Sequence, residues 1–321
     1  MSVLDTQSFA DFDSAAREVL SFLHQRIGFD LWLITRVEGE DWIVLKARDQ
    51  GYGVEEGTVF RWSDSLCSQM VAGNGPQVAP RLNIIPAYAN APIRKQLKIG
   101  AYVGVPLTYH DGSVFGTLCA IHPTSLSDTI TAELPLIELL AKLLGSLLNA
   151  DLKASEHARS AERAQTEALS DTLTKVYNRR GWDQLLEQEE KRCLQYGYSA
   201  CVIAIDLDGL KQVNDTQGHT KGDELICKAG QALRQTVRKQ DVIARVGGDE
   251  FAVLCVECNL VQAQALTKRI GAAFASAQVK ASLGIAARKP SQGLLQAWEE
   301  ADQEMYVCKR RGKVSSPLKA L

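Results

Sequence analysis

The feature that most constrains this 321-residue chain is the pentapeptide Gly247-Gly248-Asp249-Glu250-Phe251, which lies between two apolar runs. Residues 241–246 and 251–256 both have the composition of strands, and Gly-Gly between them is typical of a hairpin because both residues tolerate positive φ. Glycine also lacks the Cβ that would keep a polyanionic ligand away from the backbone. A bare hairpin needs no second acid after its turn, so the segment suggests a site for metal and phosphate. Taken alone, however, this segment is better explained as a simple hairpin without a ligand.

A second polar cluster lies upstream, where the continuous apolar run 200–205 is followed by Asp206 and Asp208. A run without alternation is the mark of a central strand buried on both faces. Polar residues and glycines follow, and apolar residues then recur at helical spacing over 225–237. The predicted order is therefore strand, polar loop, helix. Such a loop can direct backbone N–H groups and a helix N-terminus toward a triphosphate, and the carboxylates suit Mg²⁺.

With these motifs in this order, the chain from about Leu169 to Lys313 resembles the GGDEF family, the diguanylate cyclases that condense two GTP into cyclic di-GMP and two pyrophosphates. A chance match to all of the motifs at family spacing is improbable. The matching segments are 171–180 (DTLTKVYNRR), 206–211 (DLDGLK), Asn214-Asp215, Gly218-His219, Gly222-Asp223, the pentapeptide, 282–286 (SLGIA), Ala301-Asp302, Met305-Tyr306 and Lys309. The resemblance implies a mixed-sheet, palm-like nucleotidyl-cyclase domain over residues 169–321.

The resemblance also implies roles for the acidic residues. Asp206 and Asp249, with the backbone carbonyl of Leu207, would bind two Mg²⁺ ions, and Mn²⁺ is a possible substitute. Asp249 would in addition be the general base beside the attacking ribose 3′-OH. Glu250 is a further catalytic member of the motif. Divalent ions would stabilise the charge that develops on the phosphoryl oxygens and on the departing pyrophosphate.

Recognition of GTP is implied for a second set of residues. Asn214 and Asp223 would bind guanine, since a carboxylate can accept from N1–H and from the 2-amino group. Phosphate contacts are implied for Leu210, Lys211, Lys309 and Lys313. Three residues depart from the family pattern: Lys175 replaces a usual Gly, Leu210 a common Phe and Lys313 a usual Arg. None of them is a metal ligand or a guanine reader, although Lys313 lacks the planar fork that binds pyrophosphate bidentately.

Arg238 and Asp241 form an Arg-x-x-Asp motif, and five residues separate Asp241 from Gly247. The family's product-inhibition site has this spacing, so the resemblance implies that cyclic di-GMP binds here, away from catalysis. Arg245 is a further expected contact. The alternative is a helix-end arginine beside a solvated aspartate, which a bare Arg-x-x-Asp would favour. Binding at this site would crosslink domains and hold two active sites apart.

Composition limits the other function classes. A net charge of −2 and a pI near 6.2 provide no electrostatic footprint for nucleic acid. The eight cysteines mostly lie in apolar runs, which predicts buried free thiols and makes zinc or redox use of Cys255-x-x-Cys258 the weaker alternative. No basic N-terminal segment precedes an apolar stretch, and no run approaches ~18 apolar residues. We therefore expect a cytoplasmic protein with no membrane partner.

Residues 1–150 are expected to form a separate domain. Helical periodicity over 9–27 precedes two strand pairs, 31–34 with 42–45 and 102–107 with 114–121. This helix-flanked antiparallel sheet, in a chain of α+β and α/β character, resembles the GAF family. The resemblance lies in Ser65-Leu-Cys67, Gly104-Val-Pro-Leu107 and Gly116-Thr-Leu-Cys-Ala-Ile121. GAF domains bind cyclic nucleotides, bilins, haem or other small molecules, or only dimerise, so no ligand or ligand residue is assigned.

A long helical linker is predicted over residues 133–170, overlapping the last helix of the GAF-like domain. Its heptad seam is apolar at first and then becomes weak, which would let a sensory domain change the register of attached cyclases. The alternative is a solvated connecting helix. The seam consists of Leu140, Leu144, Leu147, Asp151, Ala154, Ala158, Ala161, Gln165 and Ala168.

The resemblance implies a homodimer, because each GGDEF domain holds one GTP and two must face each other. The expected protein is a GAF-regulated diguanylate cyclase with GTP as substrate and cyclic di-GMP as product and inhibitor. One alternative is a non-catalytic receptor of GTP or cyclic di-GMP, and another makes the GAF-like domain the functional centre. The receptor is disfavoured because Asp206, Asp249, Asn214 and Asp223 are all intact.

Overall fold

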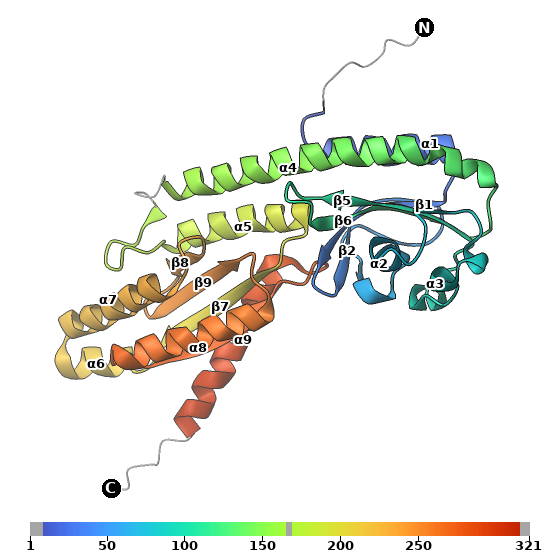
Figure 1. Cartoon of the computed structure of the whole chain (residues 1–321). Coiled ribbons are helices and arrows are strands. Elements are labelled where there is room, and N and C mark those ends of the chain that lie inside the picture. Colours follow the sequence, from blue (N-terminus) through green and yellow to red (C-terminus); the bar gives the residue numbers. More distant parts are fainter. Residues whose placement is uncertain (1–8, 165–168, 315–321) are drawn as a thin grey trace. The chain divides into compact units, whose positions relative to one another are not determined.

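The structure, a computed structural model, describes residues 9–164 and 169–314, without the side chains of 160–164 and 311–314. The described residues fall into two compact units. The N-terminal unit runs to Arg159 and includes Leu194–Gly197, and the C-terminal unit comprises Ser160–Cys193 and the residues from Tyr198 onward. Figure 1 shows the elements of both units. Within the described ranges, no helix combines the length and apolar character that crossing a membrane requires.

The N-terminal unit is built on a six-stranded antiparallel sheet with strand order β3-β2-β1-β6-β5-β4, which confirms the expected fold class. The strands are β1 (Leu31–Glu38), β2 (Asp41–Asp49), β3 (Val59–Arg61), β4 (Val78–Ala79), β5 (Ala101–Thr108) and β6 (Val114–His122). The helices are α1 (Phe12–Ile27), α2 (Leu66–Val71), α3 (Pro86–Ala89) and α4 (Leu134–Ala164), with short 3₁₀ turns at Trp62–Asp64, Leu82–Ile84, Pro92–Lys95 and Asp128–Glu133.

Helix α4 only partly follows the predicted heptad seam. Leu144 is 1% exposed and lies in the core of its own unit, whereas Leu139 and Leu143, outside the predicted seam, are 54% and 55% exposed. Asp151 Oδ2 accepts a hydrogen bond of 2.7 Å from the backbone N–H of Phe12, at the start of α1. Heptad spacing identifies a stripe but not whether the stripe packs on its own sheet or on a partner. The predicted helix also ends earlier, since Ser170 pairs with Tyr177 in an isolated bridge; Gln165 and Ala168 lie outside the described residues.

The C-terminal unit contains a four-stranded sheet of order β10-β7-β9-β8, in which all neighbouring strands are antiparallel. Tyr177 adds a parallel bridge to Ala244, so the sheet is mixed. The strands are β7 (Ala200–Leu207), β8 (Val242–Arg245), β9 (Glu250–Val256) and β10 (Ala281–Ala287). The helices are α5 (Arg179–Tyr196), α6 (Leu210–Gln217), α7 (His219–Thr236), α8 (Leu260–Ser276) and α9 (Gly293–Val314).

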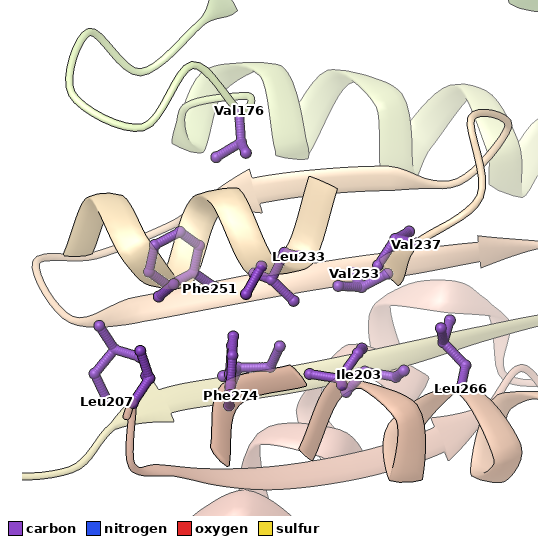
Figure 2. Packing of buried hydrophobic residues seen from close by; sticks show 14 of the residues in the cluster. Val176, Ile203, Leu207, Leu233, Val237, Phe251, Val253, Leu266 and Phe274 are labelled. Carbon is purple, nitrogen blue, oxygen red and sulfur yellow. The ribbon is translucent and has the colours of Figure 1, made fainter. Parts of the chain in front are cut away.

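Strand β7 is buried along its whole length, as its unbroken apolar run predicts. One face contributes Ile203 and Leu207 to a core formed with α7 and α8, and Figure 2 shows Leu233 and Phe274 of these helices in the same cluster. The other face contributes Val202 and Ala204 to a second core, which includes residues of α5 and α9. Because both faces are covered, the carboxylate that ends the strand is held on a rigid support.

The polar segment after β7 is not the single loop that the sequence predicts. It forms the short helix α6 and the first turns of α7, and Gly218 lies between them with a φ of 84°. A positive φ is favourable for glycine and interrupts a right-handed helix, so one residue produces the break. The abundance of Asn, Asp and Gly predicted a loop, whereas tertiary packing of Leu210 and Ile226 selects helices.

Candidate active site

Backbone pairing of three strands brings the predicted catalytic acids together. Asp206 on β7 lies opposite Glu250 on β9 and opposite Ser282 on β10. The backbone N–H of Leu207 donates to the carbonyl oxygen of Asp249 at 2.9 Å. The end of the central strand and the β8–β9 turn are thus joined by backbone hydrogen bonds, which fixes where their side chains begin.

The β8–β9 hairpin is present, but its glycines do not play the predicted part. Gly247 and Gly248 are both described, and neither adopts a positive φ. A Cβ on Gly247 would lie 2.3 Å from Glu250 Oε2, so a larger residue would displace the Glu250 carboxylate, which is the end of a flexible side chain. Gly248 has no other atom within 4 Å of its missing Cβ, so the turn is open there. The open backbone retains the access for a ligand that the sequence suggested.

Arg245 stabilises this turn. Its Nη2 and Nε atoms donate to the carbonyl oxygen of Gly248 at 2.7 and 3.2 Å, and its Nη1 lies 3.4 Å from Asp171 Oδ2. Asp171 in turn accepts from the Thr174 hydroxyl and N–H, and these bonds with the charge of Arg245 outweigh burial and lower the pKa of Asp171. The side chain of Arg245 thus contacts the turn. It is not among the residues that line a surface depression next to Arg238, which is described below.

The carboxylates of the acid cluster, Asp206, Asp249 and Glu250, disfavour one another's charge. Asp206 is 5% exposed, and its Oδ1 lies 2.5 Å from the Nζ of Lys309 on α9. Burial and the charges of Asp249 and Asp208 nevertheless raise the pKa of Asp206. Burial, together with Asp249 and Asp206, also raises the pKa of Glu250. Burial opposes the charge of Lys309, but its bond to Asp206 and the neighbouring acids outweigh that cost and raise its pKa.

The donor set fits a hard cation that is shared with a substrate. Within the described ranges, no three acidic, histidine or cysteine side chains converge closely enough to hold a metal ion by themselves. Mg²⁺ is commonly held by one or two carboxylates together with substrate phosphates and water. Asp206 and Asp249 supply oxygen donors of this kind, and their mutual repulsion would be relieved by a bound cation.

The predicted guanine readers lie at the α6–α7 junction. Asn214 is in the last turns of α6 and Asp223 is in the second turn of α7. A Cβ on Gly222 would lie 1.9 Å from the Oδ1 of Asn214, so a larger residue would displace the Asn214 amide from this position. The amide of Asn214 is therefore placed directly beside the residue that precedes Asp223.

The predicted phosphate residues differ in their surroundings. The side chain of Leu210 is buried in the core, so only its backbone N–H, at the N-terminus of α6, is available to a phosphate. Lys211 is exposed one residue later, and Lys309 lies beside Asp206. The side chain of Lys313 lies outside the described residues.

The Arg-x-x-Asp motif borders an open depression of about 450 Å³. Asp241 is 8% exposed, and its Oδ1 accepts from the N–H of Val256 at 3.0 Å, so it is not the solvated aspartate of the alternative. Burial raises the pKa of Asp241, although this hydrogen bond and the charge of Arg238 oppose the rise. Three further basic residues line the depression: Lys175, which the sequence marked only as a departure from the family pattern, and Arg234 and Lys239, which it did not single out.

The N-terminal unit contains an apolar cavity of about 20 Å³, room for roughly one water molecule. Cys67 and Cys119 line it, and the Tyr102 and Thr117 hydroxyls each lie 3.4 Å from the sulfur of Cys67. Cys67 is buried, as its interpretation as a packed thiol requires.

Two family models match the chain. Residues 168–315 match the model described as "Diguanylate cyclase, GGDEF domain", and residues 11–148 match the model described as "GAF domain".

Several curated proteins are similar to this chain. The probable diguanylate cyclase DgcJ of Escherichia coli K12 is 37% identical over 158 residues, which are 48% of this chain and 32% of that protein. The probable diguanylate cyclase DgcC of the same strain is 33% identical over 191 residues, 56% of this chain and 51% of that protein. Diguanylate cyclase DgcP, also of this strain, is 25% identical over 264 residues, 80% of this chain and 75% of that protein. The chain thus spans only 32% and 51% of the first two relatives.

A solved structure is also similar, that of the coiled coil and GGDEF domain of DgcB from Caulobacter crescentus in complex with c-di-GMP. It is 25% identical, covers 53% of this chain and 95% of its own chain, and has a TM-score of 0.45.

Proposed function

We propose that this chain, which combines a GAF domain at residues 11–148 with a GGDEF domain at residues 168–315, is a diguanylate cyclase. The observation that carries the proposal is the cluster of Asp206, Asp249 and Glu250 on joined strand ends, with Lys309 beside it. The curated relatives named above are diguanylate or probable diguanylate cyclases. The reaction would convert two GTP into cyclic di-GMP and two pyrophosphates.

In the proposed reaction, the 3′-OH of each GTP attacks the α-phosphorus of the other, a phosphoester bond forms, and pyrophosphate leaves with its bonding electron pair. Asp249 would accept the proton of the attacking hydroxyl. Asp206, Asp249 and the Leu207 carbonyl would hold Mg²⁺, or Mn²⁺ in its place, and the cation would supply charge stabilisation at the phosphoryl oxygens. Glu250 would strengthen the negative field that retains the cation.

Substrate recognition would use groups from three elements. Asn214 and Asp223 would bind the guanine edge, and the N-terminus of α6 with Lys211 would contact the phosphates. Lys309 and Lys313 would contact phosphates from α9. Because one domain holds one GTP, a homodimer is required, and positioning two substrates face to face can lower the barrier by several kcal/mol.

Replacing Lys309 with methionine is expected to raise the KM for GTP about tenfold and to lower kcat as well. The variant loses a cation, while methionine preserves most of the apolar stem of the lysine side chain. Initial rates of pyrophosphate release over a range of GTP concentrations measure both constants. Lys228, an exposed lysine of α7, provides the matched control Lys228→Met, whose constants should equal those of the wild type. Unchanged constants for Lys309→Met would remove this residue from the proposed phosphate contacts.

Cyclic di-GMP would bind at Arg238 and Asp241 and inhibit the enzyme. Five residues, most of them in strand β8, separate Asp241 from Gly247. The two positions are therefore six residue steps, or about 20 Å, apart along the strand, and the inhibitor would not overlap the acid cluster. Arg238→Ala is expected to relieve inhibition by added cyclic di-GMP by at least tenfold in the inhibitory concentration. Product formation with increasing added cyclic di-GMP is the measurement. If inhibition persists at the wild-type concentration, the site must lie elsewhere.

The N-terminal GAF domain would regulate the cyclase through the helical linker in a cytoplasmic homodimer, with functional boundaries at 1–150, 133–170 and 169–321. Purified protein incubated with GTP and Mg²⁺ tests the central proposal. We expect cyclic di-GMP and pyrophosphate in a ratio of one to two. A verified dimer that binds GTP but forms no cyclic di-GMP would instead favour a non-catalytic receptor.

A further inference from the structure

We propose that Lys175 binds a phosphodiester group of cyclic di-GMP in the depression beside Arg238 and Asp241. Product inhibition of this chain would then depend on a cation that the Arg-x-x-Asp motif does not contain. The inference deepens the proposed function, since it rests on cyclase activity and on inhibition at this depression.

The charge of the depression is strongly unbalanced. Lys175, Arg234, Arg238 and Lys239 line it, and Asp241 is the one carboxylate among its lining residues. The four cations are exposed, whereas Asp241 is buried. A ligand with two phosphodiester groups fits this excess of positive charge, and a volume of about 450 Å³ lies within the range of small-molecule sites.

The backbone fixes Lys175 at the edge of the depression. The N–H of Lys175 donates to the carbonyl oxygen of Asp171 at 3.0 Å, and the N–H of Asp171 donates to the carbonyl oxygen of Val176 at 2.7 Å. The next residue, Tyr177, donates its N–H to Ile243 on β8 at 2.9 Å. Lys175 is therefore held between a closed turn and the sheet.

The same turn is anchored to α7, which carries Arg234 and ends at Thr236, two residues before Arg238. Thr174 is 2% exposed, and its Cβ lies 2.9 Å from the position that a Cβ on Gly230 of α7 would occupy. Val176 and Val237 are both buried and belong to one core cluster, in which Figure 2 labels them. The spacing of Lys175 from Arg234 and Arg238 is thus set by packed elements and not by a long free loop.

Lys175 adopts an unfavourable backbone conformation for its residue type. Its φ is 59°, in the left-handed region where a Cβ is crowded and glycine is preferred. Two other non-glycine residues with positive φ are described, Glu257 and Gln278, and neither lines the depression. Residues held in this region commonly lie at ligand sites, where surrounding structure overcomes the strain. Lysine at this position presents a cation at a conformational cost that glycine would avoid.

The chemistry of lysine favours the phosphodiester over the Watson–Crick edge of guanine. An ammonium donates hydrogen bonds and cannot accept them, so it cannot recognise the N–H groups of the guanine Watson–Crick edge. That part of the ligand suits the Asp241 carboxylate. A phosphodiester oxygen is a charged acceptor, which an ammonium binds as a point charge.

The substitution Lys175→Gly separates a binding role from a structural one, because its two effects have opposite signs. The affinity for cyclic di-GMP, measured by titration calorimetry, should fall about tenfold, and the inhibitory concentration should rise in parallel. The Tm without ligand should rise by about 2–4 °C because the left-handed strain is removed. Lys175→Asn, which also tolerates this conformation but has no charge, should lose affinity to the same extent.

Two controls decide between outcomes. Lys228→Ala removes an exposed lysine of α7 that does not line the depression and should bind cyclic di-GMP with wild-type affinity. Raising the salt concentration should weaken wild-type binding more than binding by Lys175→Gly. If Arg238→Ala loses binding while Lys175→Gly retains wild-type affinity, the inhibitory site stands and the role of Lys175 is overturned. If the wild type does not bind cyclic di-GMP, both the inhibitory site and this inference fail.

Discussion

Replacing Asp249 with asparagine is expected to reduce cyclic di-GMP production by at least ~10³-fold, which corresponds to a loss of about 4 kcal/mol in transition-state stabilisation. The amide has the size of the carboxylate but cannot accept the hydroxyl proton, and it is a weaker ligand for a hard cation. The turn itself should persist, because its backbone bonds to Leu207 and Arg245 use carbonyl oxygens and not the Asp249 side chain. Chromatographic separation of the products formed from GTP and Mg²⁺ measures the effect.

The thermal stability of Asp249→Asn tests whether Asp249 repels the carboxylates of Asp206 and Glu250. Asp249 raises the pKa of both Asp206 and Glu250, so its removal should lower these pKa values and stabilise the metal-free protein slightly. Thermal unfolding in a chelator should therefore give an equal or higher Tm, and added Mg²⁺ should raise it less than in the wild type. Asp183→Asn, an exposed acid of α5, is the matched control and should retain full activity. Wild-type rates in Asp249→Asn would refute the proposed acid cluster.

Local patterns predicted the elements that surround the site. The apolar run ending at Asp206 is β7, and the apolar runs on either side of the Gly-Gly turn form β8 and β9. In these segments apolar residues are continuous or strongly periodic, so the local sequence itself shows which residues are buried. The segment around Gly218 was predicted wrongly as a loop, because its local preference for turns is overridden by the packing of α6 and α7 on the sheet.

Features that depend on long-range contacts were beyond the sequence. Nothing in the spacing indicates that Arg245 reaches back to Gly248 and Asp171, or that Lys175 meets the end of α7. The pairing of Lys309 with Asp206 joins residues 103 positions apart. The face of α4 that packs on its own unit likewise depends on which stripe the sheet covers, and Leu144 lies on that stripe. Sequence periodicity identifies the apolar faces of a helix, and only the fold determines which of these faces is buried.

The glycine at the centre of the 282–286 motif allows α9, the helix that carries Lys309, to pack closely against the sheet. Gly284 on β10 pairs with Ala204 on β7, and α9 crosses directly over it. A Cβ on Gly284 would lie 2.1 Å from the carbonyl oxygen of Ala301 and 2.2 Å from the backbone nitrogen of Met305. Both contacts are with helix backbone, which cannot rotate away as a side chain can. An alanine here would therefore push α9 off the sheet.

Gly284→Ala is expected to lower the free energy of unfolding by about 3 kcal/mol, the upper part of the usual range for overpacking, and the Tm by about 6–12 °C. Activity should fall as well, because Lys309 lies one turn beyond Met305 and would move away from Asp206 with the helix. Chemical denaturation and initial rates at a temperature where the variant is folded separate the two effects.

Gly271 provides the opposite case within the same unit. It lies inside α8, and no other atom lies within 4 Å of its missing Cβ. Gly271→Ala should therefore raise the free energy of unfolding by about 0.5–1 kcal/mol through helix propensity alone. If Gly284→Ala proved as stable as Gly271→Ala, α9 could not be seated against β10 as described, and the position of Lys309 beside Asp206 would lose its structural basis.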